Sequence, residues 1–299
     1  ELHFPYDKSR KMIAEALGSL GKDYVDVLTH GMDPKNGWID IYPNKAKHSG
    51  AYMDGDAYGI HPFVLCNHLD DFNSLSTLAH EMGHAVHSHL SNKHQPYPKA
   101  GYPIFVAEVA STANEQLLTD YLLAREKDPR KRLFLLGERL ETFRTTLFRQ
   151  ALFAEFELAI YREAEKGKPL TAERISEIYA GLLKRYYGHK RKVVLIDDLY
   201  TMEWAYVPHF YYNFYVFQYA TGITAATALA QMISKEGDAA RDRYLKEVLQ
   251  AGASDYAITL LRRAGVDLRT AKPYKVTMGV LRRTLDEAEK IVAQLKLGR

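Results

Sequence analysis

Apolar residues recur three and four positions apart over most of the chain, which is the spacing of one face of an α-helix. The first such stretch covers residues 8–34, and we expect Gly18 and Gly21 to divide it into two helices. Further helices are predicted at 73–89, from 104 to about 122, over 130–166, within 192–234, as two helices punctuated by Gly237 and Gly252, and at 284–296. Another helix is predicted to run to about Tyr187, with Thr171 ahead of it as its N-cap.

Three short segments instead have the character of β-strands. Residues 37–43 alternate apolar and polar, residues 61–67 form an apolar run of strand length, and turns at 47–52 and 55–59 enclose another short strand. This small sheet would directly precede the helix at 73–89. Its edge could pair with an extended peptide, or the sheet could serve only to pack against that helix.

The pattern therefore predicts a mainly α fold with a small β-sheet, built as one catalytic region over residues 1–299. Three prolines between 91 and 103 predict a loop after the helix at 73–89. Asn73 or Ser74 is expected to cap that helix at its N-terminus.

The helix at 73–89 carries the motif His80-Glu81-x-x-His84. Residues four apart lie on one helix face, so the two imidazoles can reach one Zn²⁺ at about 2.0–2.1 Å. Glu81 lies one step round the helix, where its carboxylate can take a proton from a water molecule that the metal activates. This is the metallopeptidase interpretation; the alternative is a core helix that carries hydrogen-bonded histidines.

Composition and charge exclude several other classes of protein. The formal net charge of +3 comes from 40 basic and 37 acidic residues, which does not suggest a nucleic-acid or membrane partner. No apolar run is long enough to span a bilayer, and the N-terminus lacks a signal-peptide pattern. The single cysteine, Cys66, is compatible with a reducing compartment, so a cytoplasmic location is expected.

A catalytic zinc usually has three protein ligands and one water molecule. The metzincin pattern would require Gly and His at the positions of His87 and Leu90, so that class is excluded. Glu108 on the following helix is the favoured third ligand. Glu115 lies seven residues further on the same face, where it can accept the second N–H of a ligating histidine. The alternative is that both glutamates are solvated helix charges.

The segment 206–222 is rich in tyrosine around one histidine, His209. A tyrosine hydroxyl or an imidazole can stabilise the oxyanion formed when a peptide carbonyl is attacked, an effect of about 3–4 kcal/mol. Tyr215 and Tyr219 are four residues apart and could share a helix face towards the metal. Packing of the cleft is the alternative role of these rings.

Four motifs in the same order resemble oligoendopeptidase F, a member of the thimet-oligopeptidase-like M3 zinc peptidases. They are Lys47-x-Ser-Gly-Ala-Tyr52, Ser76-Thr-Leu-Ala-His-Glu-Met-Gly-His84, Ala107-Glu-Val-Ala-Ser-Thr-Ala-Asn-Glu115 and Pro208-His-Phe-Tyr-Tyr212. The resemblance implies one zinc ion in a zincin-type catalytic domain of mainly α structure. By this resemblance, His80, His84 and Glu108 bind the zinc, Glu81 is the general base, and Glu115 supports a ligand. His209 and Tyr215 would contact the substrate or the oxyanion, and Tyr212 and Tyr219 are further candidates for that role.

The same resemblance implies a zinc endopeptidase that cleaves short oligopeptides in a channel between two mostly helical lobes. Full-length members carry an N-terminal helical lobe that is not found before Glu1. A carboxypeptidase or dipeptidyl carboxypeptidase would need a cation for the substrate carboxylate, for which Arg185, Arg191 and Lys192 are available. A third possibility is a non-catalytic peptide-binding fragment, against which the intact Glu81 argues. The expected partners are short peptides, and no feature of the sequence indicates an oligomeric state.

Overall fold

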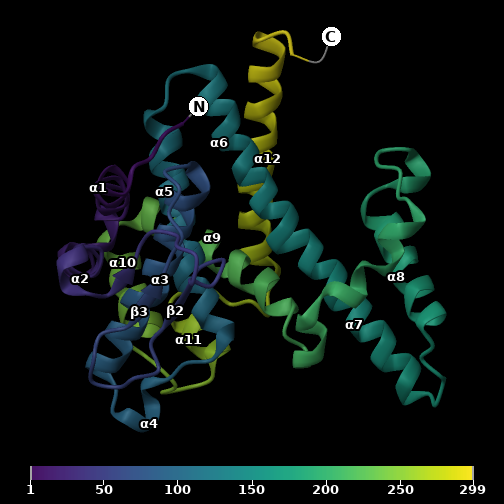
Figure 1. The fold of residues 1–299 in the computed structure, drawn as a ribbon, viewed down its shortest axis with the longest axis horizontal. Helices are drawn as coiled ribbons and strands as arrows, with labels where there is room; N and C mark the ends of the chain where they lie inside the picture. Colours follow the sequence, from purple (N-terminus) through teal and green to yellow (C-terminus); the bar gives the residue numbers. More distant parts are fainter. Residues whose placement is uncertain (1, 298–299) are drawn as a thin grey trace. The chain divides into compact units, whose positions relative to one another are not determined.

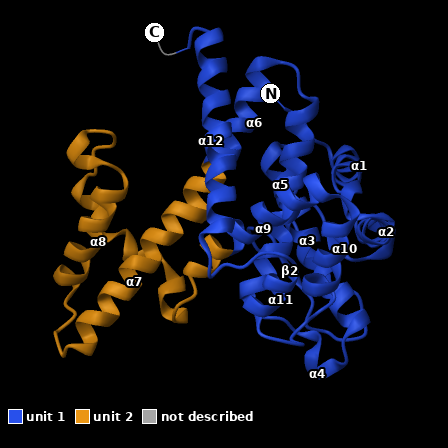
Figure 2. Ribbon diagram, turned by 180° about the vertical axis from the view of Figure 1, so that it is seen from behind, with its two compact units in different colours: residues 1–140, 222–299 blue, residues 141–221 orange. Residues whose placement is uncertain are grey.

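The computed structural model describes residues 2–297, which form two compact units (Figure 2). Unit 1 contains residues 1–140 and 222–299, and unit 2 contains residues 141–221. Each unit has a hydrophobic core of its own. The chain enters unit 2 within one long helical run and returns to unit 1 within another helix, α9.

Unit 1 is mainly helical and carries the small sheet (Figure 1). The strands β1 (Ile39–Asp40), β2 (Tyr52–Asp54) and β3 (Phe63–Leu65) lie in the order β1-β3-β2, with β1 parallel and β2 antiparallel to β3. The helices are α1 (Tyr6–Ala16), α2 (Lys22–Gly31), α3 (Phe72–His94), α4 (Tyr97–Ala100), α5 (Ile104–Arg125), α6 (Pro129–Thr142), α9 (Phe217–Glu236), α10 (Asp238–Tyr244), α11 (Ala257–Arg263) and α12 (Ala271–Gln294). This arrangement confirms the predicted fold class.

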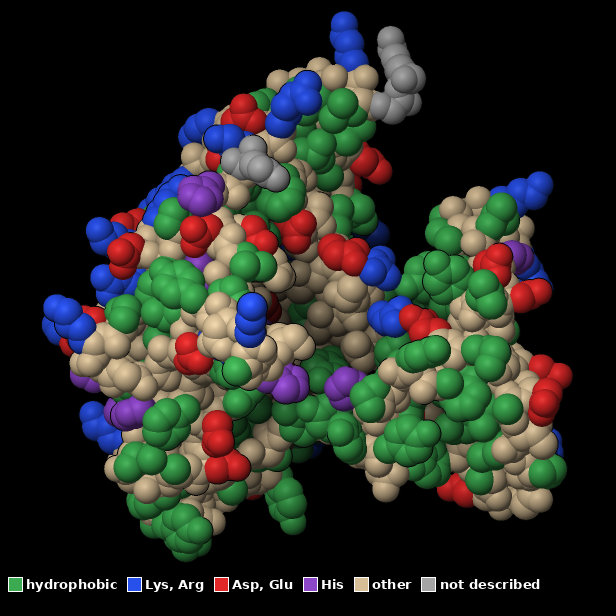
Figure 3. All heavy atoms as spheres, in the orientation of Figure 1, with side chains coloured by type: hydrophobic (Ala, Val, Ile, Leu, Met, Phe, Trp, Pro, Cys, Tyr) green, Lys and Arg blue, Asp and Glu red, His purple; other side chains and the backbone are tan. Residues whose placement is uncertain are grey.

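Unit 2 is built on α7 (Arg149–Glu165) and α8 (Ala172–Tyr186), followed by 3₁₀ segments at Asp198–Tyr206 and Pro208–Tyr212. A π-helical turn, Phe143–Phe148, joins α6 to α7. The predicted cap Thr171 accepts a hydrogen bond from the Arg174 N–H. Figure 3 shows many hydrophobic side chains on the surface of this unit, and its exposed large apolar residues include Leu195, Leu199, Tyr206 and Tyr211.

The predicted start of α3 is wrong. The helix begins at Phe72, and Asp71 caps it by accepting a hydrogen bond from the Ser74 N–H at 2.7 Å. Ser74 has a different role, because its hydroxyl accepts the Leu69 N–H from the loop before the helix. Asn73 is inside the first turn and is not the cap.

Two other predicted boundaries also differ. The segment 91–103 is not all loop, since α3 continues to His94 and α4 forms at Tyr97–Ala100, where Pro98 occupies an early helical position that needs no N–H donor. The last helix does not begin at 284 but at Ala271. Pro273 is tolerated in its first turn for the same reason.

Close packing of α3 against α5 depends on Gly83, inside the His-Glu-x-x-His motif. A Cβ atom there would lie 2.7 Å from the Cα of Ser111 and 2.9 Å from the carbonyl oxygen of Ala110. The buried amide of Asn114 ties the same helices together: it donates to the Ala79 carbonyl at 3.0 Å and accepts the Tyr24 hydroxyl at 2.8 Å. The helices of the metal motif are thus held at a fixed short separation. Over residues 2–297, none of the helices combines the length and apolarity needed to cross a bilayer.

Candidate metal and catalytic site

The helices α3 and α5 bring His80, His84 and Glu108 together in unit 1. One ligand atom from each of the three side chains lies within 4.8 Å of the other two. Glu108 Oε2 lies 3.5 Å from His80 Nε2 and 3.8 Å from His84 Nε2, and the two imidazole centroids are 4.9 Å apart. The i, i+4 spacing on α3 places the histidines, and the crossing of α5 places the carboxylate opposite them.

This geometry fits a small divalent cation such as zinc. Two ligand atoms bonded at about 2.0–2.1 Å in a tetrahedral arrangement lie roughly 3.3–3.5 Å apart. The observed separations of 3.5 and 3.8 Å need only small side-chain adjustments to reach that value. Two imidazoles and one carboxylate are also a ligand set that zinc uses in catalytic sites, where a fourth position stays open.

Three further side chains hold the ligand residues in place. Glu115 Oε2 lies 3.4 Å from His80 Nδ1, the ring nitrogen that faces away from Glu108. The Ser76 hydroxyl donates to Glu115 at 3.3 Å, and the Ser111 hydroxyl donates to Glu108 at 3.1 Å. Ser111 shares the helix face of both glutamates, but Ser76 was not predicted. Its position four residues before His80 on the same helix was the available signal.

Glu81 is a buried carboxylate beside this group, with 7% of its surface exposed. Burial, together with the charges of Glu108 and Glu115, raises the pKa of Glu81 to about 7, although His80 acts in the opposite direction. A carboxyl group with a pKa near neutrality can both take up and release a proton at neutral pH, which is the requirement for a general acid–base group.

The two histidines differ in protonation. Burial lowers the pKa of His80, but the negative charges of Glu115, Glu108 and Glu81 outweigh burial and raise that pKa to about 9. Burial and the neighbouring His80 hold the pKa of His84 well below its usual value. A neutral His84 presents a lone pair, whereas His80 holds a proton that a bound cation would displace.

The aromatic group around His209 lies in unit 2. The ring of His209 is 5.5 Å from that of Tyr215, 6.0 Å from that of Tyr212 and 6.2 Å from that of Tyr219, measured between centroids. Tyr215 precedes the first residue of α9, Phe217, so the prediction that Tyr215 and Tyr219 share a helix face is wrong. A turn of the chain places Tyr215 against His209. The metal group belongs to unit 1 and the His209 group to unit 2, and the catalytic roles of all these residues stay predictions.

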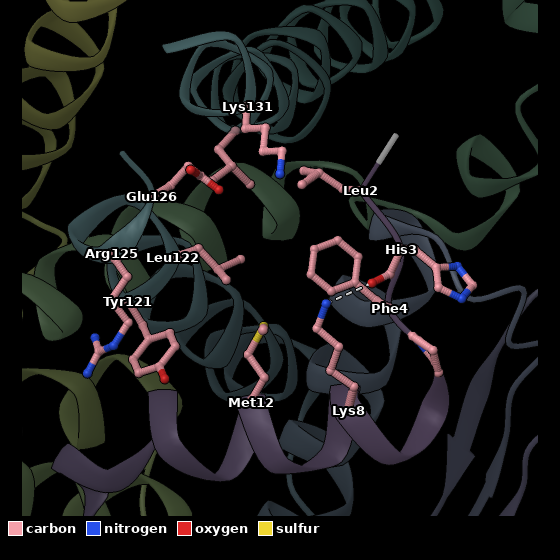
Figure 4. Close-up of a pocket in the computed structure, with 12 residues that line it drawn as sticks. Leu2, His3, Phe4, Lys8, Met12, Tyr121, Leu122, Arg125, Glu126 and Lys131 are labelled. Atoms are coloured by element: carbon pink, nitrogen blue, oxygen red, sulfur yellow. Dashed lines mark hydrogen bonds between the residues drawn. The ribbon is translucent and has the colours of Figure 1, made fainter. Parts of the chain in front are cut away.

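A separate pocket of about 570 Å³ opens in unit 1 between the N-terminal segment, α1, α5 and α6 (Figure 4). Its lining is largely apolar and includes Phe4, Met12 and Leu122, with the basic side chains of Lys8 and Arg125 beside them (Figure 4). None of the predicted site residues lines this pocket.

Comparison with known proteins gives a consistent result. Residues 12–280 match the model of peptidase family M3. Oligopeptidase PepF of Bacillus subtilis (strain 168) is 46% identical over 291 residues, which are 97% of this chain and 42% of that protein. Group B oligopeptidase PepB of Streptococcus agalactiae is 40% identical over 98% of this chain and 48% of its own length.

A crystal structure of oligoendopeptidase-F from Enterococcus faecium has the same fold. The two structures superpose with a TM-score of 0.72 at 36% sequence identity. The superposition covers 96% of this chain and 44% of the Enterococcus faecium chain. The chain thus spans about half the length of the curated relatives it matches. Because residues 12–280 match the family model and the relatives are 36–46% identical, the chain belongs to peptidase family M3, a family of metallopeptidases. Its relatives in that family are of the oligoendopeptidase F type.

Proposed function

We propose that this chain carries the catalytic region of a zinc endopeptidase that hydrolyses short oligopeptides. The observation that carries the proposal is the convergence of His80, His84 and Glu108, with ligand atoms within 4.8 Å of one another, beside the buried Glu81. Membership of family M3 supports peptidase chemistry, and the names of the relatives support oligopeptides as substrates.

His80, His84 and Glu108 would hold one zinc ion, and Glu115 would keep His80 in the tautomer that directs Nε2 towards it. A zinc ion held there supplies Lewis acidity, which makes water nucleophilic at neutral pH and polarises the scissile carbonyl. Glu81 takes the proton from the attacking water and passes it to the leaving amine. Burial raises the pKa of Glu81, which favours release of the proton to the leaving amine after it has been taken up.

His209 and Tyr215 are proposed to stabilise the oxyanion of the attacked carbonyl, with Tyr212 and Tyr219 as further candidates. Within residues 2–297, no hydrogen bond occupies the hydroxyl of Tyr215 or a ring nitrogen of His209, so both can donate to a substrate. A hydrogen bond made only in the transition state would raise kcat without improving substrate binding.

The substitution Glu81→Gln tests the mechanism. The amide has nearly the shape of the carboxylate but cannot accept the proton, so we expect zinc binding to persist while kcat falls about 10²–10⁴-fold. Zinc content is measured by elemental analysis and activity with an end-blocked fluorogenic peptide. Zinc binding combined with near-normal turnover would refute the role of Glu81.

Product mapping separates endopeptidase from exopeptidase action. A carboxypeptidase or dipeptidyl carboxypeptidase would leave a C-terminally amidated peptide uncut, whereas the proposed endopeptidase cleaves it internally. Arg185 is a weak candidate for binding a substrate carboxylate, because its guanidinium already pairs with Glu155. Zinc binding without cleavage of any peptide would favour the non-catalytic alternative. The cytoplasmic location stays a prediction.

A further inference from the structure

A backbone turn of unusual conformation lies between His209 and Tyr215. Asn213 and Phe214 are consecutive residues with positive φ, 43° and 56°. Positive φ is unfavourable for residues with a Cβ atom, and Asn213, whose ψ is 107°, lies outside the small left-handed helical basin that asparagine tolerates. The conformation persists only where surrounding contacts impose it.

Burial of the Phe214 side chain does not impose the positive-φ conformation of this turn. Phe214 is 49% exposed, so the turn does not place its ring in the core of unit 2. The core of unit 2 instead anchors the two flanks of the turn. Phe210 packs on Phe153 and Phe156 of α7, with centroid distances of 5.3 and 5.1 Å, and Val216 is 1% exposed. These anchors leave the conformation of Asn213 and Phe214 to be determined by other contacts.

Two residues of α7 provide those contacts. The carboxylate of Glu157, which is 1% exposed, accepts the Phe214 N–H at 2.7 Å. The Tyr161 hydroxyl donates to the Asn213 side-chain oxygen at 2.5 Å, and the Tyr161 ring stacks on Phe214 at 4.9 Å. Glu157 and Tyr161 are four residues apart and therefore lie on one face of α7. Together they bind both residues of the turn.

We propose that Glu157 and Tyr161 are positioning residues, which hold the Asn213–Phe214 turn and thereby seat Tyr215 against His209. The inference rests on the proposed function in so far as it assigns Tyr215 to the oxyanion. The physical reason is that a buried carboxylate accepting a backbone N–H fixes the path of the chain more firmly than a solvated contact. Without that acceptor, the turn would relax to negative φ and carry Tyr215 away from the imidazole.

Matched variants isolate the acceptor. Glu157→Gln keeps a carbonyl oxygen for the Phe214 N–H, whereas Glu157→Met fills similar space without one. We expect kcat to fall about 10- to 100-fold in Glu157→Met, less than the roughly 10²–10³-fold for complete loss of one oxyanion donor because the hydroxyl is displaced and not removed, with KM little changed. Glu157→Gln should stay close to the parent protein. Tyr161→Phe keeps the stacked ring, loses only the hydroxyl and should show a smaller fall.

A spectroscopic measurement makes the test independent of activity. His209 is surrounded by three tyrosine rings, so the NMR signal of its ring C–H group reports the position of those rings. The signal is recorded in histidine-labelled, zinc-loaded protein. It is assigned to His209 because it is missing from the spectrum of His209→Gln. The signal should move towards that of a solvent-exposed histidine in Glu157→Met and stay in place in Glu157→Gln. An unmoved signal in folded Glu157→Met would overturn the proposal. If Glu157→Met does not fold, Tyr161→Phe carries the same test.

A double variant shows whether Glu157 acts through Tyr215. If it does, Glu157→Met combined with Tyr215→Phe should be no slower than Tyr215→Phe alone, because both changes remove the same interaction. Additive losses would overturn this route. If the His209 signal moves as expected but Tyr215→Phe has normal kcat, the positioning role stands and the oxyanion role of Tyr215 in the proposed function is refuted.

Discussion

Substitution of Gly83 by alanine tests whether the separation of α3 and α5 determines metal binding. The added Cβ would lie 2.7 Å from the Ser111 Cα, whereas ordinary contacts begin at 3.4 Å, so the helices must move apart by about 0.7 Å. Zinc sites tolerate deviations of only about 0.2 Å in ligand distance. Since His80 and His84 are on one of these helices and Glu108 is on the other, we expect zinc affinity to fall at least about tenfold.

Gly137→Ala is the matched control. Gly137 lies in the helix α6, and no heavy atom is within 4 Å of a Cβ built there. Both substitutions gain about 1 kcal/mol of helix propensity, so the difference between the two variants isolates the packing cost. That cost should be about 1–3 kcal/mol, the usual penalty for overpacking a core.

The assay combines urea denaturation with zinc titration against a competing chelator. Gly137→Ala should be about 1 kcal/mol more stable than the parent protein and bind zinc equally well. Gly83→Ala should be about 1–3 kcal/mol less stable than Gly137→Ala and should bind zinc more weakly. If Gly83→Ala equals Gly137→Ala in both measurements, the close helix approach does not determine the geometry of the metal group.

Three further predictions concern single side chains. Tyr215→Phe should lower kcat and kcat/KM together by about 10²–10³-fold with little change in KM, measured by steady-state kinetics; a change in KM alone would assign Tyr215 to substrate packing. Burial raises the pKa of the Cys66 thiol to about 12. At pH 8 the thiol should therefore resist alkylation in the folded protein and react after denaturation. Rapid labelling of the folded protein would contradict this prediction. Zinc binding at pH 7 should release a proton from His80, whose pKa is raised to about 9, and this release should disappear as pH rises above 9. Calorimetry in buffers of different ionisation enthalpy measures the number of protons released. No proton release at pH 7 would argue against displacement of the His80 proton.

Features that depend on residues close in sequence could be predicted without a structure. The helical period, the glycine breaks between α1 and α2 and the cap Thr171 reflect interactions within one or two turns. The pairing of His80 with His84 is likewise a property of a single helix. The order of the four motifs sufficed to recognise the family, because each motif retains its own local spacing.

Tertiary structure decided what depends on residues distant in sequence. Glu108 meets the two histidines only because α5 crosses α3 at Gly83, and no local pattern specifies that crossing. Helix periodicity placed Tyr215 and Tyr219 on one face, but Tyr215 lies before α9. Its contact with His209 accompanies a turn of two positive-φ residues, and Glu157, 57 residues from Phe214, holds that turn by one hydrogen bond. Local sequence thus determines which element a residue belongs to, whereas packing between elements determines which side chains meet, because the free energy of those contacts is realised only in the assembled core.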